Sequence, residues 1–215
     1  MKIFISYAHQ DKERVGELKR YLYVYNFNVF IAHDDISISA DWIDIIISKL
    51  ASCDIFIPYL TEHFNDSDWT DQETGYALAK GIKIIPINAG KNPRGFIRGI
   101  QALKYKDASD ASRKIIRALL ETSDLKDRTM DLLITVYGKS GTFDNAADNL
   151  DVILEFESDL TVQKKNEIIR LAGINNQIYD GRSAKRKVYG FIRRNQSELN
   201  EEYIRNFSRN SGFNI

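Results

Sequence analysis

Trp69 and Glu73 stand four positions apart in the segment DWTDQETGYALAKG. Residues at that spacing lie on one face of a helix, so an indole ring and a carboxylate would sit side by side. A carboxylate that is shielded from water can stabilise positive charge developing on a substrate, because the electrostatic interaction is stronger there. The pair is therefore a candidate for chemistry at an electron-poor carbon.

The same segment also has a structural interpretation. Thr70-x-x-Glu73 is the pattern of a capping box, with Thr70 as the N-cap and Glu73 reaching back to the N-cap amide. Acidic residues in a first helical turn also interact favourably with the helix dipole. A cap of this kind contributes about 1 kcal/mol. The residues alone leave the catalytic and the capping interpretations open.

Composition limits the classes of function. The 215 residues include 30 basic and 30 acidic side chains, a balance that gives no support to nucleic-acid binding as the main function. The single cysteine, Cys53, cannot form an internal disulfide, and we expect it to be a small buried hydrophobe rather than a nucleophile. There is no apolar run of the ~18 residues that a membrane span requires, and no signal-peptide pattern. These features predict a cytoplasmic protein without membrane contacts.

We expect no metal site. The three histidines are far apart in the sequence, and none belongs to an H-x-x-x-H or C-x-x-C arrangement. Glycine motifs for nucleotide phosphates are also missing, since SYAHQD after the first strand contains no G-x-G-x-x-G and AGKNPRG lacks the order of a P-loop. A Rossmann dehydrogenase and a P-loop enzyme are therefore disfavoured.

Apolar runs alternate with helical repeats through the first half of the chain. Strands are predicted at residues 2–7, 27–32, 53–60, 83–90 and 99–105, with helices at 10–26, 42–52 and from 68 onward. This alternation predicts βαβ units, which form a parallel sheet with helices on both faces. Ligands of such sheets bind at the carboxyl ends of the strands, so the residues that follow each strand matter most.

The order of these segments resembles the Toll/interleukin-1 receptor (TIR) domain. FISYAHQD resembles the first box of that family, FNVFIAHDD with ISISADW resembles its second strand and BB loop, and residues 53–87 resemble its third strand, catalytic helix and fourth strand. The similarity covers residues 1–106. It implies an α/β, flavodoxin-like fold with a five-stranded parallel sheet.

The resemblance also implies an activity. TIR domains that cleave NAD+ carry a glutamate in W-x-x-x-E, which Trp69 and Glu73 match, so Glu73 is the expected catalytic residue of an NAD+ glycohydrolase or ADP-ribosyl cyclase. NAD+ would be the substrate, with no separate cofactor. A single carboxylate suffices because nicotinamide leaves as a neutral pyridine, whereas the leaving oxygen of ordinary glycosidases needs a proton from a second carboxyl group.

Further binding residues are expected by position. His9 stands where some active relatives have a basic residue, and a neutral imidazole offers one hydrogen bond where arginine offers a charged fork. Trp42 and Trp69 offer flat faces for a nucleobase or a cationic ring, and Asp34 and Asp35 are equal candidates for the acidic BB-loop position. The expected binding set is Tyr7, Ala8, His9, Asp34, Trp42 and Trp69.

The family further implies partners. TIR domains self-associate, often with the BB loop completing a neighbour's site, and bacterial members resemble antiphage-defence components whose nucleotide product acts on an effector or whose activity depletes NAD+. Two alternatives remain open. One is a non-enzymatic TIR scaffold, and the other is a nucleoside deoxyribosyltransferase-like enzyme, which also uses a carboxylate at a ribose carbon.

The second half of the chain differs in composition. Every proline, tryptophan and histidine precedes residue 107, so we expect a TIR domain at 1–122 and a mostly helical domain at 123–215 for sensing, assembly or regulation. Two apolar runs, 131–138 and 151–156, could instead be strands. Gly173 is a candidate C-cap, Ser183 and Ser197 are candidate N-caps. A basic cluster within 182–194 could contact phosphates, or it could face the acidic residues within 144–159.

Overall fold

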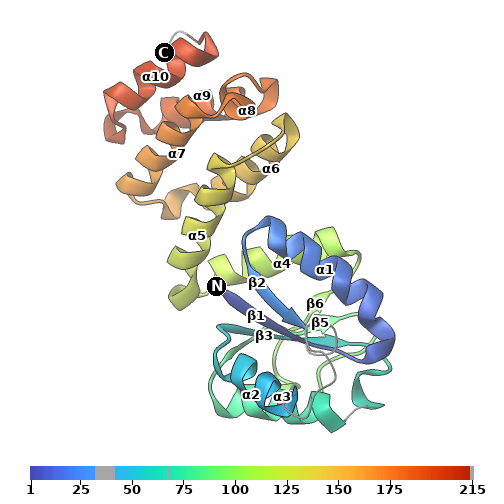
Figure 1. Cartoon of the computed structure of the whole chain (residues 1–215). Coiled ribbons are helices and arrows are strands. Elements are labelled where there is room, and N and C mark those ends of the chain that lie inside the picture. The colour runs from blue at the N-terminus through green and yellow to red at the C-terminus, as the bar shows by residue number, and fades with distance from the viewer. Residues whose placement is uncertain (32–41, 67, 214–215) are drawn as a thin grey trace. The chain divides into compact units, whose positions relative to one another are not determined.

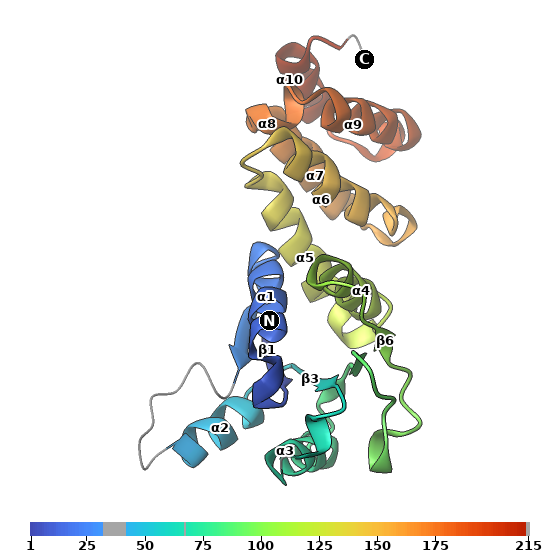
Figure 2. The ribbon, with the colours of Figure 1, turned by 90° about the vertical axis from the view of Figure 1, so that its right-hand side faces the viewer.

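The computed structural model describes residues 1–31, 42–66 and 68–213 of the chain (Figure 1). The chain divides into two compact units, Met1–Thr122 and Ser123–Ile215. The first unit combines strands and helices, whereas the described residues of the second form helices and turns only (Figure 2). The predicted α/β fold followed by a helical region is confirmed.

A parallel sheet forms the centre of the first unit. Its strands lie in the order β2-β1-β3-β5-β6, with β4 also paired to β3, and every pairing is parallel. The central register places Ile3 of β1 opposite Val29 of β2 and Ile55 of β3. The strands are β1 (Lys2–Ser6), β2 (Asn28–Ile31), β3 (Ile55–Leu60), β4 (Lys83–Ile84), β5 (Ile87–Asn88) and β6 (Leu103–Lys104).

The strand predicted at 83–90 is two strands, so the sheet has six strands in five positions. Pro86 separates β4 from β5, because proline has no N–H to donate to the ladder. The chain nevertheless stays beside its neighbours, since the Ile85 amide donates to the Phe56 carbonyl at 3.0 Å and the Leu103 amide donates to the Pro86 carbonyl at 2.8 Å. The last predicted strand, 99–105, shortens to the two residues of β6.

Helices cover both faces of this sheet (Figures 1 and 2). One face carries α1 (Lys12–Val24) and α4 (Ala108–Leu120), and the other carries α2 (Trp42–Ala51) and α3 (Asp68–Ala79). Because both faces are covered, the strands read as continuous apolar runs rather than as alternating ones. On the α2–α3 face the core is a cluster of Phe4, Ile46, Leu50, Phe56, Ala77, Ile84 and Ile97.

The second unit is a set of helices. The two runs that could have been strands fall within α5 and the end of α6, so the helical prediction is confirmed there. Thr142 and Thr161 cap α6 and α7 by accepting backbone hydrogen bonds. The helices are α5 (Ser123–Gly138), α6 (Phe143–Leu154), α7 (Val162–Ile174), α8 (Asn176–Tyr179), α9 (Arg182–Asn195) and α10 (Glu201–Ser211).

All three cap predictions for this unit are wrong. Gly173 lies inside α7, where a Cβ atom would come within 2.8 Å of the Asn206 side chain and 3.3 Å of the Phe207 amide, so its role is close packing against α10. Ser183 lies inside α9, whose N-cap is Gly181. Ser197 belongs to a 3₁₀ turn, and Asn200 caps α10 instead by accepting from the Glu202 amide.

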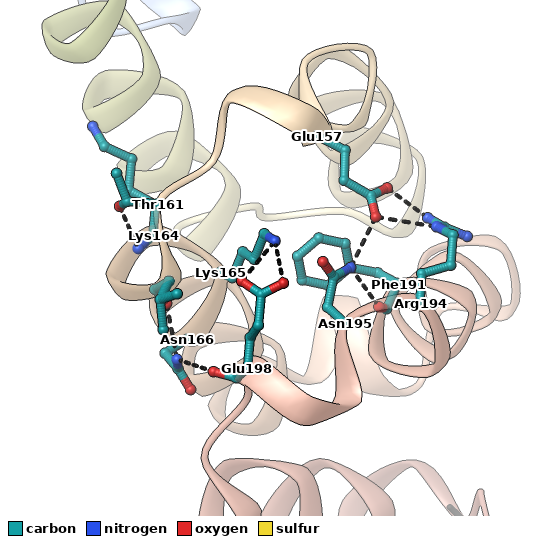
Figure 3. Close-up of polar contacts among 10 residues, drawn as sticks. Glu157, Thr161, Lys164, Lys165, Asn166, Phe191, Arg194, Asn195 and Glu198 are labelled. Atoms are coloured by element: carbon teal, nitrogen blue, oxygen red, sulfur yellow. Dashed lines mark hydrogen bonds and ion pairs between the residues drawn. The ribbon is translucent and has the colours of Figure 1, made fainter.

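The acidic and basic clusters of this unit face each other in part. Lys187 pairs with Asp151 at 2.6 Å, and Arg194 donates two hydrogen bonds to Glu157 (Figure 3). The Asn195 side chain donates to the same Glu157 carboxylate at 2.8 Å. Lys187 and Arg194 therefore have acidic partners within the unit. This favours the interpretation that these cations face the acidic residues rather than phosphates.

Candidate active site

Glu73 is buried where α3 packs against the end of β1. Its side chain lies in the second turn of α3 and is only 6% exposed. β1 ends at Ser6, whose hydroxyl donates a hydrogen bond to Glu73 Oε2 at 2.5 Å. A carboxyl group and a hydroxyl group therefore meet at the carboxyl edge of the sheet, where parallel α/β folds bind their ligands.

The capping-box interpretation of this segment is wrong. α3 begins at Asp68, so Thr70 is its third residue and not its N-cap. The Thr70 hydroxyl donates to the Phe64 carbonyl at 2.5 Å, and the Glu73 carboxyl group reaches across to β1. These two side chains tie α3 to the loop after β3 and to the end of β1.

Burial controls the protonation of Glu73. It raises the pKa of Glu73 from the usual value of 4.5 to about 7, and the hydrogen bond from Ser6 offsets part of that effect. The cause is the loss of hydration of the charged form, which a donor aimed at the carboxylate partly replaces. A carboxyl group that titrates near neutrality at a sheet edge is a candidate for catalysis.

The other expected binding residues lie in different environments. Trp69 is half-buried, one turn before Glu73 on α3. Tyr7 and Ala8 are buried directly after β1, and His9 is exposed where the next turn begins. Trp42 is the first residue of α2, and Asp34, like Asp35, lies outside the described residues.

Ser6 is a residue that the sequence analysis did not assign to the site. The signal for it was its place at the end of the first strand, among the residues that parallel sheets present to ligands. A second buried polar pair had no such signal. Asp11 is 7% exposed and accepts a hydrogen bond from Thr61 at 2.6 Å, which ties the loop after β1 to the end of β3.

Three further features were compared with the expectations from the sequence. Among them, no group of three or more histidine, cysteine, aspartate or glutamate side chains is arranged to hold a metal ion. Burial raises the pKa of the Cys53 thiol to about 11, so the reactive thiolate is scarce at neutral pH. No helix in the described part of the chain combines the length and apolarity that crossing a membrane requires.

Three solved structures are similar to part of the chain. The TIR domain of the Toll-related receptor TRR-2 from Hydra magnipapillata has 18% identity and a TM-score of 0.44, covering 58% of this chain and 95% of its own. The CMP N-glycosidase BcmB of Clostridium botulinum has 21% identity and a TM-score of 0.42, with coverages of 54% and 98%. The 2-deoxyribosyltransferase of Bacillus psychrosaccharolyticus has 14% identity and a TM-score of 0.41, with coverages of 52% and 90%.

The sequence comparisons give one decisive match. No curated protein matches this sequence. The family model of the TIR domain, however, matches residues 3–120, which include Ser6, Glu73 and all of the described sheet except Lys2. The chain therefore belongs to the TIR-domain family.

Proposed function

We propose that this chain cleaves the bond between nicotinamide and ribose in NAD+, with Glu73 as the catalytic residue. The observation that carries the proposal is the burial of Glu73 at the carboxyl edge of the sheet, with the Ser6 hydroxyl 2.5 Å from its carboxyl group. The position of Glu73 in the W-x-x-x-E motif of a TIR domain supports the same assignment.

The proposed step needs negative charge but no general acid. When the C1′–N bond breaks, both electrons go to the ring nitrogen, and nicotinamide leaves as a neutral molecule. The ribose becomes an oxocarbenium-like cation, which the Glu73 carboxylate stabilises. Water then adds at C1′ and loses one proton, giving ADP-ribose, whereas capture by a nucleophile of the same molecule gives a cyclic product.

The substrate itself favours the active form of Glu73. With a pKa of about 7, the residue is divided between its acid and carboxylate forms at neutral pH. Bound NAD+ brings a cationic ring close to it, and an opposite charge within ~4–6 Å lowers the pKa of a carboxyl group. NAD+ binding and ionisation of Glu73 therefore reinforce each other.

The remaining roles in the proposal follow the sequence analysis. Trp69 would contact the nicotinamide ring through a cation–π interaction of ~0.5–2 kcal/mol. Segments after β1 and β2, together with Trp42, would hold the rest of the dinucleotide. Self-association and a role in antiviral defence, through a nucleotide signal or NAD+ depletion, belong to the same proposal.

The test replaces only the charge of Glu73. Glu73→Gln keeps an oxygen that can accept from Ser6, and we expect nicotinamide release from NAD+ to fall at least ~100-fold. Glu62→Gln is the matched control. It makes the same chemical change at an exposed side chain in the loop after β3. Mass analysis of the products, with dilute and with crowded protein, identifies a linear or a cyclic product.

Three results would contradict the proposal. Equal activity of wild type and Glu73→Gln would remove the catalytic role of Glu73. No nicotinamide release from concentrated wild-type protein would favour the scaffold alternative. Transfer of deoxyribose between nucleosides, without cleavage of NAD+, would favour the deoxyribosyltransferase alternative.

A further inference from the structure

Helix α9 carries six basic side chains and no acidic one. Oppositely charged side chains three or four positions apart would stabilise a helix, and α9 contains no such pair. Lys187 and Arg194 are neutralised by carboxylates of the same unit (Figure 3). The other four cations of α9 are Arg182, Lys185, Arg186 and Arg193.

Three of these four cations form a single line along the helix, which we call the arginine stripe: Arg182, Arg186 and Arg193. At 3.6 residues per turn, their spacings of four and seven positions place them within about 40° of one another. All three are exposed, and none of them forms an ion pair with a carboxylate in the described part of the chain. The opposite side of α9 is buried and consists of Ala184, Val188, Phe191, Ile192 and Asn195.

The first part of the stripe lies where positive charge lowers the stability of the helix. Arg182 is the first residue of α9, and Lys185 also belongs to the first turn, where the helix dipole favours anions. Arg182 and Arg186 are four positions apart, a spacing at which like charges repel each other. A ligand with several negative charges would relieve both unfavourable interactions. The placement of the stripe therefore favours a polyanion as its partner.

The aromatic rings beside the stripe already have partners. Tyr189 stacks on Phe213, with ring centroids 5.0 Å apart. Lys185 Nζ lies over the Phe213 ring at 5.5 Å from its centroid, and the Arg193 guanidinium lies over the Tyr189 ring at 5.9 Å. Proteins that hold single-stranded nucleic acid stack its bases on aromatic side chains. This surface offers cations for phosphates rather than rings for bases.

The apolar side chains of α9 argue against a membrane as the partner. A helix that binds at a lipid surface inserts apolar side chains between the lipids. In α9 the large aliphatic and phenylalanine side chains are all buried against the rest of the unit. The exposed side of the helix therefore has charge but nothing to insert.

The shape of the exposed side suits the backbone of a DNA duplex. Gly190 lies between Arg186 and Arg193 along the helix and has no side chain, so a ligand backbone can come close. A Cβ atom there would meet only the end of the Arg194 side chain, at 3.2 Å. The helix rises ~16 Å from Arg182 to Arg193. The major groove of B-DNA admits an α-helix, whereas that of an RNA duplex is too narrow for side chains to read.

We propose that α9 is a binding surface for double-stranded DNA, whose phosphates are contacted by the arginine stripe. The forked guanidinium group matches the geometry of a phosphate and can donate two hydrogen bonds to it. Because phosphate contacts carry no sequence information directly, the binding is independent of DNA sequence. The surface belongs to the second unit and does not depend on the proposed NAD+ chemistry of Glu73. The zero net charge of the whole chain gives no sign of it, because the acidic residues lie on other elements.

Fluorescence anisotropy of a labelled DNA duplex, titrated with the full chain at several salt concentrations, tests the proposal. We expect a Kd of about 10⁻⁶–10⁻⁴ M near physiological salt, as is typical of sequence-independent binding. Replacing all three stripe arginines by glutamine should weaken binding at least ~10-fold. It should also make the slope of log K against log salt shallower by about 2.7, which is about 0.9 for each phosphate contact.

The matched control makes the same change of charge elsewhere. It combines Arg20→Gln, Arg98→Gln and Arg113→Gln, three exposed arginines of the first unit, and should bind DNA nearly as wild type does. Thermal unfolding separates lost binding from lost folding. The stripe variant should match or exceed wild type in its thermal midpoint, because the substitutions remove repulsion between like charges.

Several results would overturn the proposal. One is the absence of DNA binding even at low salt, and another is an equal loss of binding in the stripe variant and the control variant. Tighter binding of single-stranded DNA, or of an RNA duplex of the same sequence, would contradict the assignment to double-stranded DNA. Binding to anionic lipid vesicles or to polyglutamate, without binding to DNA, would assign the stripe to a membrane or to an acidic protein instead.

Discussion

The Ser6 hydroxyl donates a hydrogen bond to the Glu73 carboxyl group across 67 positions of the sequence, at 2.5 Å. The two residues are 1% and 6% exposed, so the contact is shielded from water. It stabilises the charged form of Glu73, while burial favours the neutral form. One hydroxyl group therefore both orients the proposed catalytic side chain and offsets part of the effect of burial on its pKa.

The first prediction concerns the pH dependence of catalysis. Because the proposed reaction needs ionised Glu73, kcat/KM for NAD+ cleavage should rise with pH, with its midpoint at a pH of about 7. Ser6→Ala removes the hydrogen bond that lowers the pKa, so the midpoint should move to higher pH and activity at neutral pH should fall. Nicotinamide release, measured across the pH range at low NAD+ concentration, gives both profiles.

Ser6→Thr is the matched variant, since it keeps a hydroxyl group at the same position and should retain a midpoint closer to that of wild type. An equal loss of activity in Ser6→Ala at every pH would contradict the protonation role. It would leave Ser6 with a packing role only.

A second prediction links Glu73 to stability. Its pKa is raised from 4.5 to about 7 in the folded state, a shift that corresponds to about 3 kcal/mol. The stabilisation is complete below the unfolded value of 4.5 and is lost as the pH rises through about 7. Glu73→Gln removes this dependence, so the variant should exceed wild type in free energy of unfolding above pH ~8 and approach it in acid. Urea denaturation at several pH values measures the difference. Parallel plots of unfolding free energy against pH for the two proteins would refute the prediction.

Two glycines in helices should respond oppositely to alanine. Gly173→Ala places a Cβ atom 2.8 Å from the Asn206 side chain and 3.3 Å from the Phe207 amide, so we expect overpacking to cost about 1–3 kcal/mol. Gly75→Ala meets no atom within 4 Å and should stabilise the protein by about 1 kcal/mol through helix propensity. Thermal unfolding of the two variants provides the comparison. Similar shifts of the thermal midpoint in the same direction would show that α7 and α10 can move apart without loss of stability.

The buried amide of Asn195 should matter to the helical unit. Its Nδ2 donates to Glu157 Oε1 at 2.8 Å and to the Phe191 carbonyl at 2.9 Å (Figure 3). Asn195→Ala leaves these acceptors with one donor fewer and should lower the free energy of unfolding by about 1–3 kcal/mol. Arg186→Ala, at an exposed position of the same helix, is the control. An equal loss of unfolding free energy in both variants would mean that the Asn195 hydrogen bonds stabilise the helical unit no more than an exposed side chain does.

Much of the fold follows from the sequence alone. Strands β1 to β4 and helices α1 to α3 begin near their predicted residues, because apolar periodicity depends on near neighbours in the chain. Boundaries were less predictable. The cap of α10 is Asn200 rather than Ser197, since several polar residues there can cap a helix and only the path of the chain selects one of them.

Residue types and spacings alone predict the alternation of elements, the helical second half and the TIR motif that contains Trp69 and Glu73. The packing of the folded chain is needed to show that Glu73 turns toward Ser6 and not back to its own helix end. It also shows that Ile97 enters the core while Phe96 stays exposed. Such choices depend on contacts between residues far apart in the chain. A sequence pattern records residue types and spacings, and the distances between distant segments arise when the sheet and its helices pack together.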